Sequence, residues 1–321
     1  MATKKTNRII SFVMPVLNEE KSLEEAVNSV FSQELPKDSS CELILALGPS
    51  KDATNAVAER LSKEFSALVL CDNPKGLTSA GLNIAIGKAN GDVIIRVDAH
   101  ARLTQGYAKT AIEILDSNPK IGNVGGVMRA QGDDDFTNAV AWAYTSRYGL
   151  GGGKFHVGGD AGAVDTVYLG VFRKGVLVEA GFFDESVVRG QDWELNQRIR
   201  NLGHLVWFDP RLEVFYRPRS SWKALASQFY KTGLWRGKLS RTDFPNISAK
   251  YLAPPLLIIL TLFWVPVWVY LLAIGVISYT AKLPYSSRIY LLLVLPTMHY
   301  TWGAGFILGI LFPALAKAEG E

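Results

Sequence analysis

The chain has 321 residues, with 34 Lys or Arg against 30 Asp or Glu, so its net charge is only +4 and does not favour a nucleic-acid partner. Cys41 and Cys71 lack metal-ligand spacing and lie in or beside apolar runs, as reduced core residues of a cytosolic domain do. Hydrophobic residues make up 48% of the chain, and the excess lies after Tyr251. Composition therefore predicts one large domain followed by an apolar appendage.

The first hundred residues alternate between short apolar runs and amphipathic segments. The pattern predicts strands over 8–16, 41–47, 67–71 and 92–97, and helices over 22–31, 50–63 and 78–88. Such alternation is typical of an α/β fold with a parallel sheet covered by helices. Ligands of these sheets bind at the carboxyl ends of the strands. Asn18, Asp52 and Asp98 all follow predicted strands, so we expect them at that edge.

Asp98 and His100 stand two residues apart directly after the last of these strands. Residues with this spacing on an extended chain point the same way, so both side chains can face one ligand. A carboxylate and an imidazole suit a hard divalent cation such as Mg²⁺ or Mn²⁺, which would neutralise a diphosphate. The alternative is that Asp98 caps the following turn and His100 is simply solvated.

The middle of the chain is less regular. It predicts a helix over 104–115 and strands over 122–129 and 165–172. A glycine-rich stretch over 149–162 lacks the Lys-Ser/Thr ending of a P-loop. It is therefore either a phosphate cradle of another kind, a mobile loop near an acceptor, or a plain connection.

Asp192 stands at the predicted start of a helix whose apolar face is Leu195, Ile199 and Leu202. The helix dipole favours an ionised carboxylate at this position. Glu194 is the competing carboxylate, but two residues along a helix correspond to about 200° of rotation, so both cannot face the same group. The alternative is a helix-terminal carboxylate with no chemistry.

Two apolar stretches, 252–280 and 289–311, follow a segment rich in Lys and Arg between residues 211 and 250. Each stretch is long enough to cross the hydrocarbon core of a bilayer, which is about 30 Å thick. By the positive-inside rule, the large domain and both chain ends would lie in the cytoplasm. A fully buried helical hairpin of a soluble protein is the alternative.

Four motifs together resemble the inverting family 2 glycosyltransferases, which have a GT-A fold. They lie at 13–20, 73–76, 97–101 and 191–195, and the resemblance covers roughly residues 9–238. The pattern with His100 and the stretch from Asp165 onward look most like the succinoglycan-type exopolysaccharide glucosyltransferases. Those are membrane-associated enzymes that extend a lipid-linked saccharide.

The resemblance implies a donor-nucleotide site and a metal site. Asp52 matches the second acidic position of the nucleotide-binding loop, whereas 45–48 replaces the first acidic pair. Asp98 and His100 occupy the ends of the DxD motif, with His100 in place of its second Asp, and would hold Mg²⁺ or Mn²⁺. The implied donor-binding residues are Pro15, Asn18, Glu19, Asp52, Lys75, Gly76 and Asp98.

The resemblance also implies an acceptor side. Asp192 matches the acidic residue that serves as the catalytic base. Trp235 matches the tryptophan of the Gln-x-x-Arg-Trp motif of processive synthases, but Thr232 and Leu234 replace its polar partners, which argues against a processive polymerase. The residues expected near the acceptor or diphosphate are Gln191, Glu194, Trp235 and Arg236.

Taken together, the sequence predicts a membrane-associated inverting glycosyltransferase. It would move a sugar from a nucleotide-diphosphate sugar, with a UDP-sugar as the first candidate, to a lipid-linked saccharide in exopolysaccharide or cell-envelope glycan synthesis. Residues 1–240 would form the cytoplasmic GT-A domain, and 241–321 a multi-pass segment in the cell membrane. The alternatives are a catalytically silent membrane scaffold that binds a nucleotide sugar, and a processive polysaccharide synthase.

Overall fold

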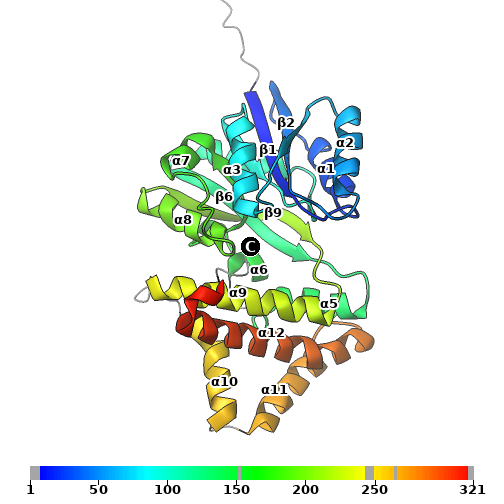
Figure 1. Cartoon of the computed structure of the whole chain (residues 1–321), viewed down its shortest axis with the longest axis vertical. Coiled ribbons are helices and arrows are strands. Elements are labelled where there is room, and N and C mark those ends of the chain that lie inside the picture. Colours follow the sequence, from blue (N-terminus) through cyan, green and yellow to red (C-terminus); the bar gives the residue numbers. More distant parts are fainter. Residues whose placement is uncertain (1–7, 151–152, 243–248, 264–265, 317–321) are drawn as a thin grey trace, which may run out of the picture. The chain divides into compact units, whose positions relative to one another are not determined.

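The structure is a computed structural model that describes residues 8–150, 153–242, 249–263 and 266–316. It contains two compact units, each assembled from two separate stretches of chain (Figure 1). The first comprises Met1–Met128 and Gly158–Tyr216, and the second comprises Arg129–Val157 and Arg217–Glu321. The functional division into 1–240 and 241–321 stays a prediction.

The first unit is built on a sheet that has nine strands among the described residues. Their order is β3-β2-β1-β4-β8-β6-β9-β5, with β7 paired to β9. β1 is parallel to β2 and β4, and β2 is parallel to β3, whereas β8 is antiparallel to β4 and β6, and β5 and β7 are antiparallel to β9. The strands are β1 (Arg8–Val16), β2 (Ser39–Leu47), β3 (Leu68–Asp72), β4 (Val93–Arg96), β5 (Ala101–Leu103), β6 (Ile121–Ala130), β7 (Gly162–Ala163), β8 (Tyr168–Arg173) and β9 (Leu205–Tyr216). The predicted α/β sheet is confirmed, and its second half makes it mixed.

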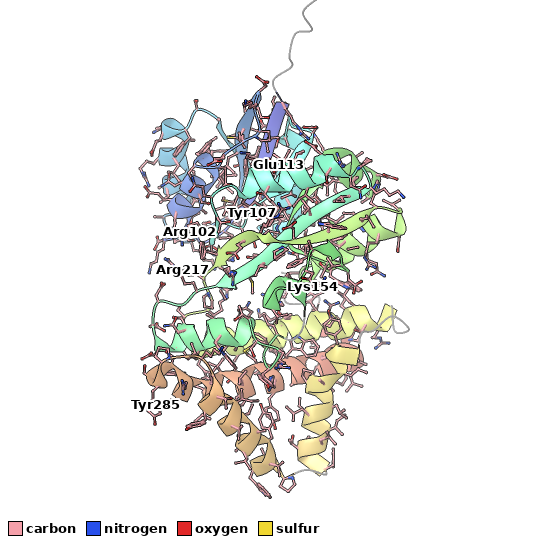
Figure 2. All side chains as sticks on the ribbon, turned by 180° about the vertical axis from the view of Figure 1, so that it is seen from behind. Arg102, Tyr107, Glu113, Lys154, Arg217 and Tyr285 are labelled. Carbon is pink, nitrogen blue, oxygen red and sulfur yellow. The ribbon has the colours of Figure 1, made fainter. Side chains whose placement is uncertain are left out.

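Helices cover both faces of this sheet because its central strands are apolar on both faces. The alternate β1 residues Ile10, Phe12 and Met14 pack into one core with α1 (Leu23–Phe31), α2 (Thr54–Glu64) and α4 (Tyr107–Ser117). At the start of α4, Tyr107 points into the interior (Figure 2), and its hydroxyl donates to the Leu169 carbonyl at 3.2 Å.

The opposite face of the sheet lies under α3 (Thr78–Lys88). Gly81 lets this helix approach closely, because a Cβ there would lie 3.2 Å from the Cβ of Pro15. The unit is completed by α7 (Lys174–Glu179) and α8 (Gln191–Asn201). The parallel strands β1, β2 and β4 all end at one edge of the sheet, so the loops that follow them share that edge.

The second unit is helical over its described residues. Its helices are α5 (Asp135–Tyr144), α6 (Lys154–Val157), α9 (Trp222–Thr242), α10 (Ala253–Phe263), α11 (Val267–Thr280) and α12 (Tyr285–Leu311), with short 3₁₀ turns at Ala249–Leu252 and Pro313–Ala316. α6 lies within the glycine-rich stretch 149–162, of which residues 151–152 lie outside the described residues. The N-terminal end of α12 is held to α5, because the hydroxyls of Ser286 and Ser287 both donate to Asp135 at 2.7 Å.

Glycines bring α9 and α12 into backbone contact. A Cβ at Gly233 or Gly237 of α9 would lie 2.1 or 2.2 Å from carbonyl oxygens of α12. Reciprocally, a Cβ at Gly305 or Gly309 of α12 would lie 2.2 or 2.0 Å from carbonyl oxygens of α9. Each helix therefore carries two glycines four residues apart, a spacing that allows close helix packing.

The predicted membrane stretches need one correction. The stretch 252–280, expected as one kinked spanning segment, forms the separate helices α10 and α11, and α11 begins directly after Pro266. Helices of 11 and 14 residues are about 17 and 21 Å long, too short to cross about 30 Å of hydrocarbon. The prediction for 289–311 corresponds to α12, the one described helix long and apolar enough to cross a membrane by length and composition.

The α9–α12 contact gives a stability prediction. Gly305→Ala should lower the thermal unfolding midpoint of the detergent-purified chain, because the added methyl group would lie 2.2 Å from the carbonyl oxygen of Tyr230. Gly275→Ala on α11 is the matched control, since nothing lies within 4 Å of the position that its methyl group would take and alanine favours a helix by up to about 1 kcal/mol. Equal midpoints for the two variants would contradict the contact.

Candidate active site

Arg96 joins two carboxylates that lie 94 positions apart in the sequence, Asp98 and Asp192. β4 ends at Arg96, and the alternation of an extended chain turns Asp98 to the same side. The Arg96 Nε and Nη2 atoms donate to Asp98 Oδ1 at 3.1 and 3.0 Å, and Nη1 donates to Asp192 Oδ1 on α8. Arg96 itself is 4% exposed. One buried guanidinium therefore holds the predicted metal ligand and the predicted base together.

Asp192 occupies the first turn of α8, which begins after Gly190 with φ +82°. Burial raises the pKa of Asp192 above its ordinary value, Arg96 opposes this rise, and the nearby Asp98 adds to it. Burial alone would lower the pKa of Arg96, but Asp192 and Asp98 outweigh it and raise that pKa. The sequence predicted a carboxylate stabilised by the helix dipole, and the structure adds Arg96 as its counter-ion.

Glu194, the competing carboxylate, is engaged elsewhere. Arg198 donates through Nε to Glu194 Oε1 at 2.6 Å and through Nη2 to Oε2 at 2.7 Å. Both oxygens of Glu194 are therefore bound by a bidentate ion pair within α8. Gln191 is the first residue of the same helix. This arrangement favours Asp192 over Glu194 as a group that can accept a proton.

His100 lies between β4 and β5 and pairs with Glu19, which follows β1. The His100 Nδ1 atom is 2.8 Å from Glu19 Oε1, and the other Glu19 oxygen accepts a hydrogen bond from Ser22 at 2.6 Å. With the Nδ1 proton donated to Glu19, the His100 Nε2 atom keeps a lone pair for a metal ion, and such carboxylate partners orient metal-binding histidines. The ring of His100 also packs edge-on against Tyr216 at 5.6 Å.

The donor set for a metal is small. The described residues contain no cluster of three or more His, Cys, Asp or Glu side chains able to hold a metal ion. Asp98 and His100 nevertheless fit Mg²⁺ or Mn²⁺ in a site where diphosphate oxygens complete the coordination, because Mg²⁺ is often held by one or two protein ligands plus substrate phosphates. Asp98 Oδ1 faces Arg96, which leaves Oδ2 for such a role.

The loops after β1 and β2 are tied to each other by reciprocal hydrogen bonds. Asn18, with φ +56°, accepts from the Lys51 amide at 2.7 Å. Asp52 Oδ2 accepts from the Glu20 amide at 3.3 Å, and the Thr54 hydroxyl lowers the pKa of Asp52. Both loops thus form one rigid rim at the carboxyl edge of the sheet. That Pro15, Asn18, Glu19 and Asp52 bind a nucleotide stays a prediction.

The remaining predicted site residues have other partners. Lys75 Nζ is 2.6 Å from Glu185 Oε2, and this bond lowers the pKa of Glu185. Gly76 has φ +63°, a conformation that favours glycine. Trp235 and Arg236 belong to α9 in the second unit, where Lys238 lies over the Trp235 ring at 4.0 Å. Their predicted place near the acceptor stays a prediction.

Two polar residues of the cluster had no assigned role in the sequence. Arg96 could have been recognised as a cation on a buried strand with the same facing as Asp98, by the alternation rule. Tyr168 on β8 comes close only through long-range pairing. Burial raises the pKa of Tyr168 well above its usual value, and Asp98 adds to this rise, so its hydroxyl stays protonated as a donor. That buried hydroxyl has no hydrogen-bond partner among the described residues.

Comparison with known proteins identifies the family. The family model described as Glycosyl transferase family 2 matches residues 11–177, more than half of the chain. The chain belongs to glycosyltransferase family 2. This glycosyltransferase is therefore a transferase of an inverting family, as predicted.

Two curated relatives extend the family 2 assignment. The chain is 28% identical over 228 residues to the succinoglycan biosynthesis protein ExoA of Rhizobium meliloti, covering 70% of this chain and 68% of ExoA. It is 26% identical over 313 residues to the dolichyl N-acetyl-alpha-D-glucosaminyl phosphate 3-beta-D-2,3-diacetamido-2,3-dideoxy-beta-D-glucuronosyltransferase of Methanococcus voltae, covering 94% and 97% of the two chains. These relatives act in exopolysaccharide or glycan synthesis.

Solved structures confirm the predicted GT-A fold of this glycosyltransferase. The mannosyltransferase PcManGT from Pyrobaculum calidifontis, in complex with GDP-Man and Mn²⁺, aligns with a TM-score of 0.61 at 19% identity, over 98% of this chain and 90% of that one. S. aureus TarS 1–349 in complex with UDP-GlcNAc aligns with a TM-score of 0.54 at 15% identity, over 94% and 91%. At these identities the likeness carries the fold alone.

The Arg96 cluster gives a stability prediction. Arg96→Met should reduce the free energy of unfolding by about 3 kcal/mol, the lower end of the cost of removing one partner from a buried ion pair, because Asp192 is partly exposed. Arg96→Lys keeps the charge and should cost less. Arg102→Met is the control, since Arg102 is a surface residue paired with Glu25 at 3.0 Å and such pairs contribute at most about 1 kcal/mol. Urea unfolding followed by fluorescence measures all three, and equal losses for the two Met variants would contradict the cluster.

Proposed function

We propose that this family 2 enzyme is membrane-associated and moves a sugar from a nucleotide-diphosphate sugar to a lipid-linked saccharide, in exopolysaccharide or cell-envelope glycan synthesis. The observation that carries the proposal is the Arg96 cluster, because it places Asp98, at the diphosphate end, beside Asp192, at the acceptor end. Transfer with inversion requires both functions at once: stabilisation of the leaving diphosphate and removal of the acceptor proton.

In the proposed mechanism, the acceptor hydroxyl oxygen attacks the anomeric carbon while the bond from that carbon to the diphosphate oxygen breaks. Asp192 takes the hydroxyl proton, and the nucleoside diphosphate leaves from the opposite face of the sugar, so the anomeric configuration inverts. Burial raises the pKa of Asp192, which makes it a stronger base than an exposed aspartate. Arg96 keeps this carboxylate ionised before the acceptor arrives.

On the donor side, Asp98 and His100 would hold a divalent cation. Such a cation, when bound, supplies a Lewis acid that neutralises the diphosphate. Glu19 orients the His100 ring for this role. Pro15, Asn18, Asp52, Lys75 and Gly76 form the proposed nucleotide side, with a UDP-sugar as the first candidate donor.

Two features support the lipid-linked acceptor and the membrane. The Methanococcus voltae relative, which matches 94% of this chain, carries in its name a dolichyl-linked sugar phosphate as acceptor. The second unit has an apolar surface on α10 and α11, on which Leu262 and Phe263 are 70% and 75% exposed. Both features suit an enzyme that works on a saccharide at a bilayer surface.

The two alternatives have less support. A silent scaffold has no need of an arginine that joins the metal motif to the base position. A processive synthase has one relative in its favour, the poly-beta-1,6-N-acetyl-D-glucosamine synthase of Staphylococcus epidermidis at 25% identity, but this chain spans only 48% of that protein. Thr232 and Leu234 also depart from the processive motif. Product length on a defined lipid-linked acceptor separates a single transfer from polymerisation.

The base assignment is tested by Asp192→Asn. The change removes the charge with little change of shape, and kcat should fall about 10²-fold or more, the usual size of a general-base contribution. Nucleotide-sugar affinity should persist, because the donor contacts are assigned to other residues. Glu194→Gln is the matched control and should lower kcat less, since Glu194 is bound by Arg198. Normal turnover of Asp192→Asn together with an inactive Glu194→Gln would assign the base to the wrong carboxylate.

The metal assignment is tested by chelation. Treatment with EDTA should abolish transfer, and Mn²⁺ or Mg²⁺ should restore it, because neither Asp98 nor His100 alone neutralises a diphosphate. His100→Asp should retain Mn²⁺-dependent activity, since it restores the usual second carboxylate of the motif. Glu19→Gln should raise the Mn²⁺ concentration needed for half-maximal activity, because the His100 ring loses its charged partner. Unchanged activity of the wild-type enzyme in EDTA would refute the metal role.

A further inference from the structure

The second unit contains one helix of spanning length, α12, yet α12 is not placed to span. It is packed along α9 by the glycines described above, and the contact extends over the whole of α9. Trp222 Nε1 donates to the Thr297 hydroxyl at 2.6 Å near one end, and Arg241 Nη1 donates to the Ile310 carbonyl at 2.7 Å near the other. The two helices therefore run parallel, and whatever medium surrounds α9 also surrounds this part of α12.

α9 is unsuited to hydrocarbon. Its basic residues are distributed from its first turn to its last: Lys223, Lys231, Arg236, Lys238 and Arg241. A Lys or Arg at the centre of a membrane helix costs about 2.5–3.5 kcal/mol on insertion scales, and five such residues on one helix exclude a transmembrane position. The first part of α12 lies instead against α5, through Asp135 and through the edge-on contact of Phe136 with Tyr290. α12 thus has polar partner helices along its length.

α10 and α11 have the opposite character. Residues 251–281 contain no Asp, Glu, Lys or Arg. Only Pro255 of α10, and only Ile274 and Ser278 of α11, are buried among their described side chains. The two helices leave the α9–α12 pair as the arms of a V (Figure 1). Their large exposed apolar residues are Leu256, Ile259, Leu262, Phe263, Val267, Trp268, Val269, Leu271, Leu272, Val276 and Tyr279.

The length of the arms sets the depth they can reach. Arms of about 17 and 21 Å, inclined to each other, penetrate roughly half of a hydrocarbon core about 30 Å thick. A protein groove would cover one side of such a helix, whereas these helices are apolar around their circumference. Hydrocarbon is the partner that contacts all sides at once and asks for no hydrogen bonds.

The charges beside the V identify the kind of bilayer. Residues 217–250 contain eight Lys or Arg and one acidic residue, Asp243, and no Asp or Glu occurs from 244 to 318. Lys282 and Arg288 follow α11 on the return side. Cations on both sides of an apolar insertion match the headgroups of an anionic leaflet, where each contributes about 1 kcal/mol.

We propose that α10 and α11 form a re-entrant hairpin that enters one leaflet of an anionic bilayer and returns to the same face. The chain is then anchored in the membrane without crossing it, and α9 and α12 lie at the headgroup level. This inference rests on the proposed membrane association and replaces its predicted multi-pass topology with a monotopic one. A lipid-linked acceptor would be reached from the leaflet into which the hairpin is inserted.

Topology is the decisive measurement. Tyr285 and Phe312, 78% and 56% exposed, mark the two ends of α12, and Figure 2 shows Tyr285 pointing outward. In full-length chains whose native cysteines are replaced by alanine, Tyr285→Cys and Phe312→Cys should react with an impermeant maleimide from the same side of sealed inverted membrane vesicles. Phe263→Cys should be protected from both sides, and a spin label there should be accessible to oxygen. Labelling of the two α12 ends from opposite sides, or of position 263 from the far side, would overturn the hairpin.

Vesicle flotation tests the anchor. The double variant Leu262→Asp, Phe263→Asp should lose most of its binding to vesicles of phosphatidylcholine with 30% phosphatidylglycerol. Val178→Asp, at a 55% exposed apolar residue of the first unit, is the matched control and should bind as the wild type does. Unchanged nucleotide-sugar affinity shows that the double variant is folded. Wild-type binding with opposite-side labelling refutes the hairpin alone, whereas failure of the wild type to bind vesicles also refutes the membrane part of the proposed function.

Discussion

The buried Arg96 guanidinium is the constraint on which the candidate site depends. Two carboxylates in one partly dry pocket repel each other, and neither stays ionised there without a cation close by. Arg96 supplies that cation from the end of a central strand, which is among the most rigid positions of the fold. The sheet thereby fixes the distance between the donor and acceptor halves of the site, and the surrounding loops need only bind the substrates.

The parts of this site that the sequence could predict are those encoded locally. Period-two alternation indicated β1 and β4, and strand ends indicated the edge at which Asn18, Asp52 and Asp98 lie, since side-chain direction in a strand is a local property. The position of β8 between β4 and β6 was not predictable, because it depends on pairing across more than 40 residues. Tyr168 therefore had no predicted role, and neither did the Glu19–His100 pair, which joins residues 81 positions apart.

The apolar segment shows where composition misleads. Hydrophobicity averaged over 252–280 describes α10 and α11 as well as it describes one continuous helix, because Pro266 changes the backbone and leaves the apolar content nearly the same. Likewise α12 has the composition of a spanning helix, and only its glycine contacts with the cationic α9 indicate a different position. Partners of a helix, as much as its own residues, determine the medium in which it lies.

The interleaved chain path of the two units also has a consequence for biosynthesis. Every strand of the first unit has been synthesised once Tyr216 is made, so its sheet can form while the following residues are still in the ribosome. The second unit needs α12, which begins 43 residues after α9 ends. Until then the glycine face of α9 has no partner and α5 has no serine hydroxyls to bind. Insertion of the apolar arms into a leaflet would shelter the nascent chain during this interval, so that membrane capture precedes completion of the helical unit.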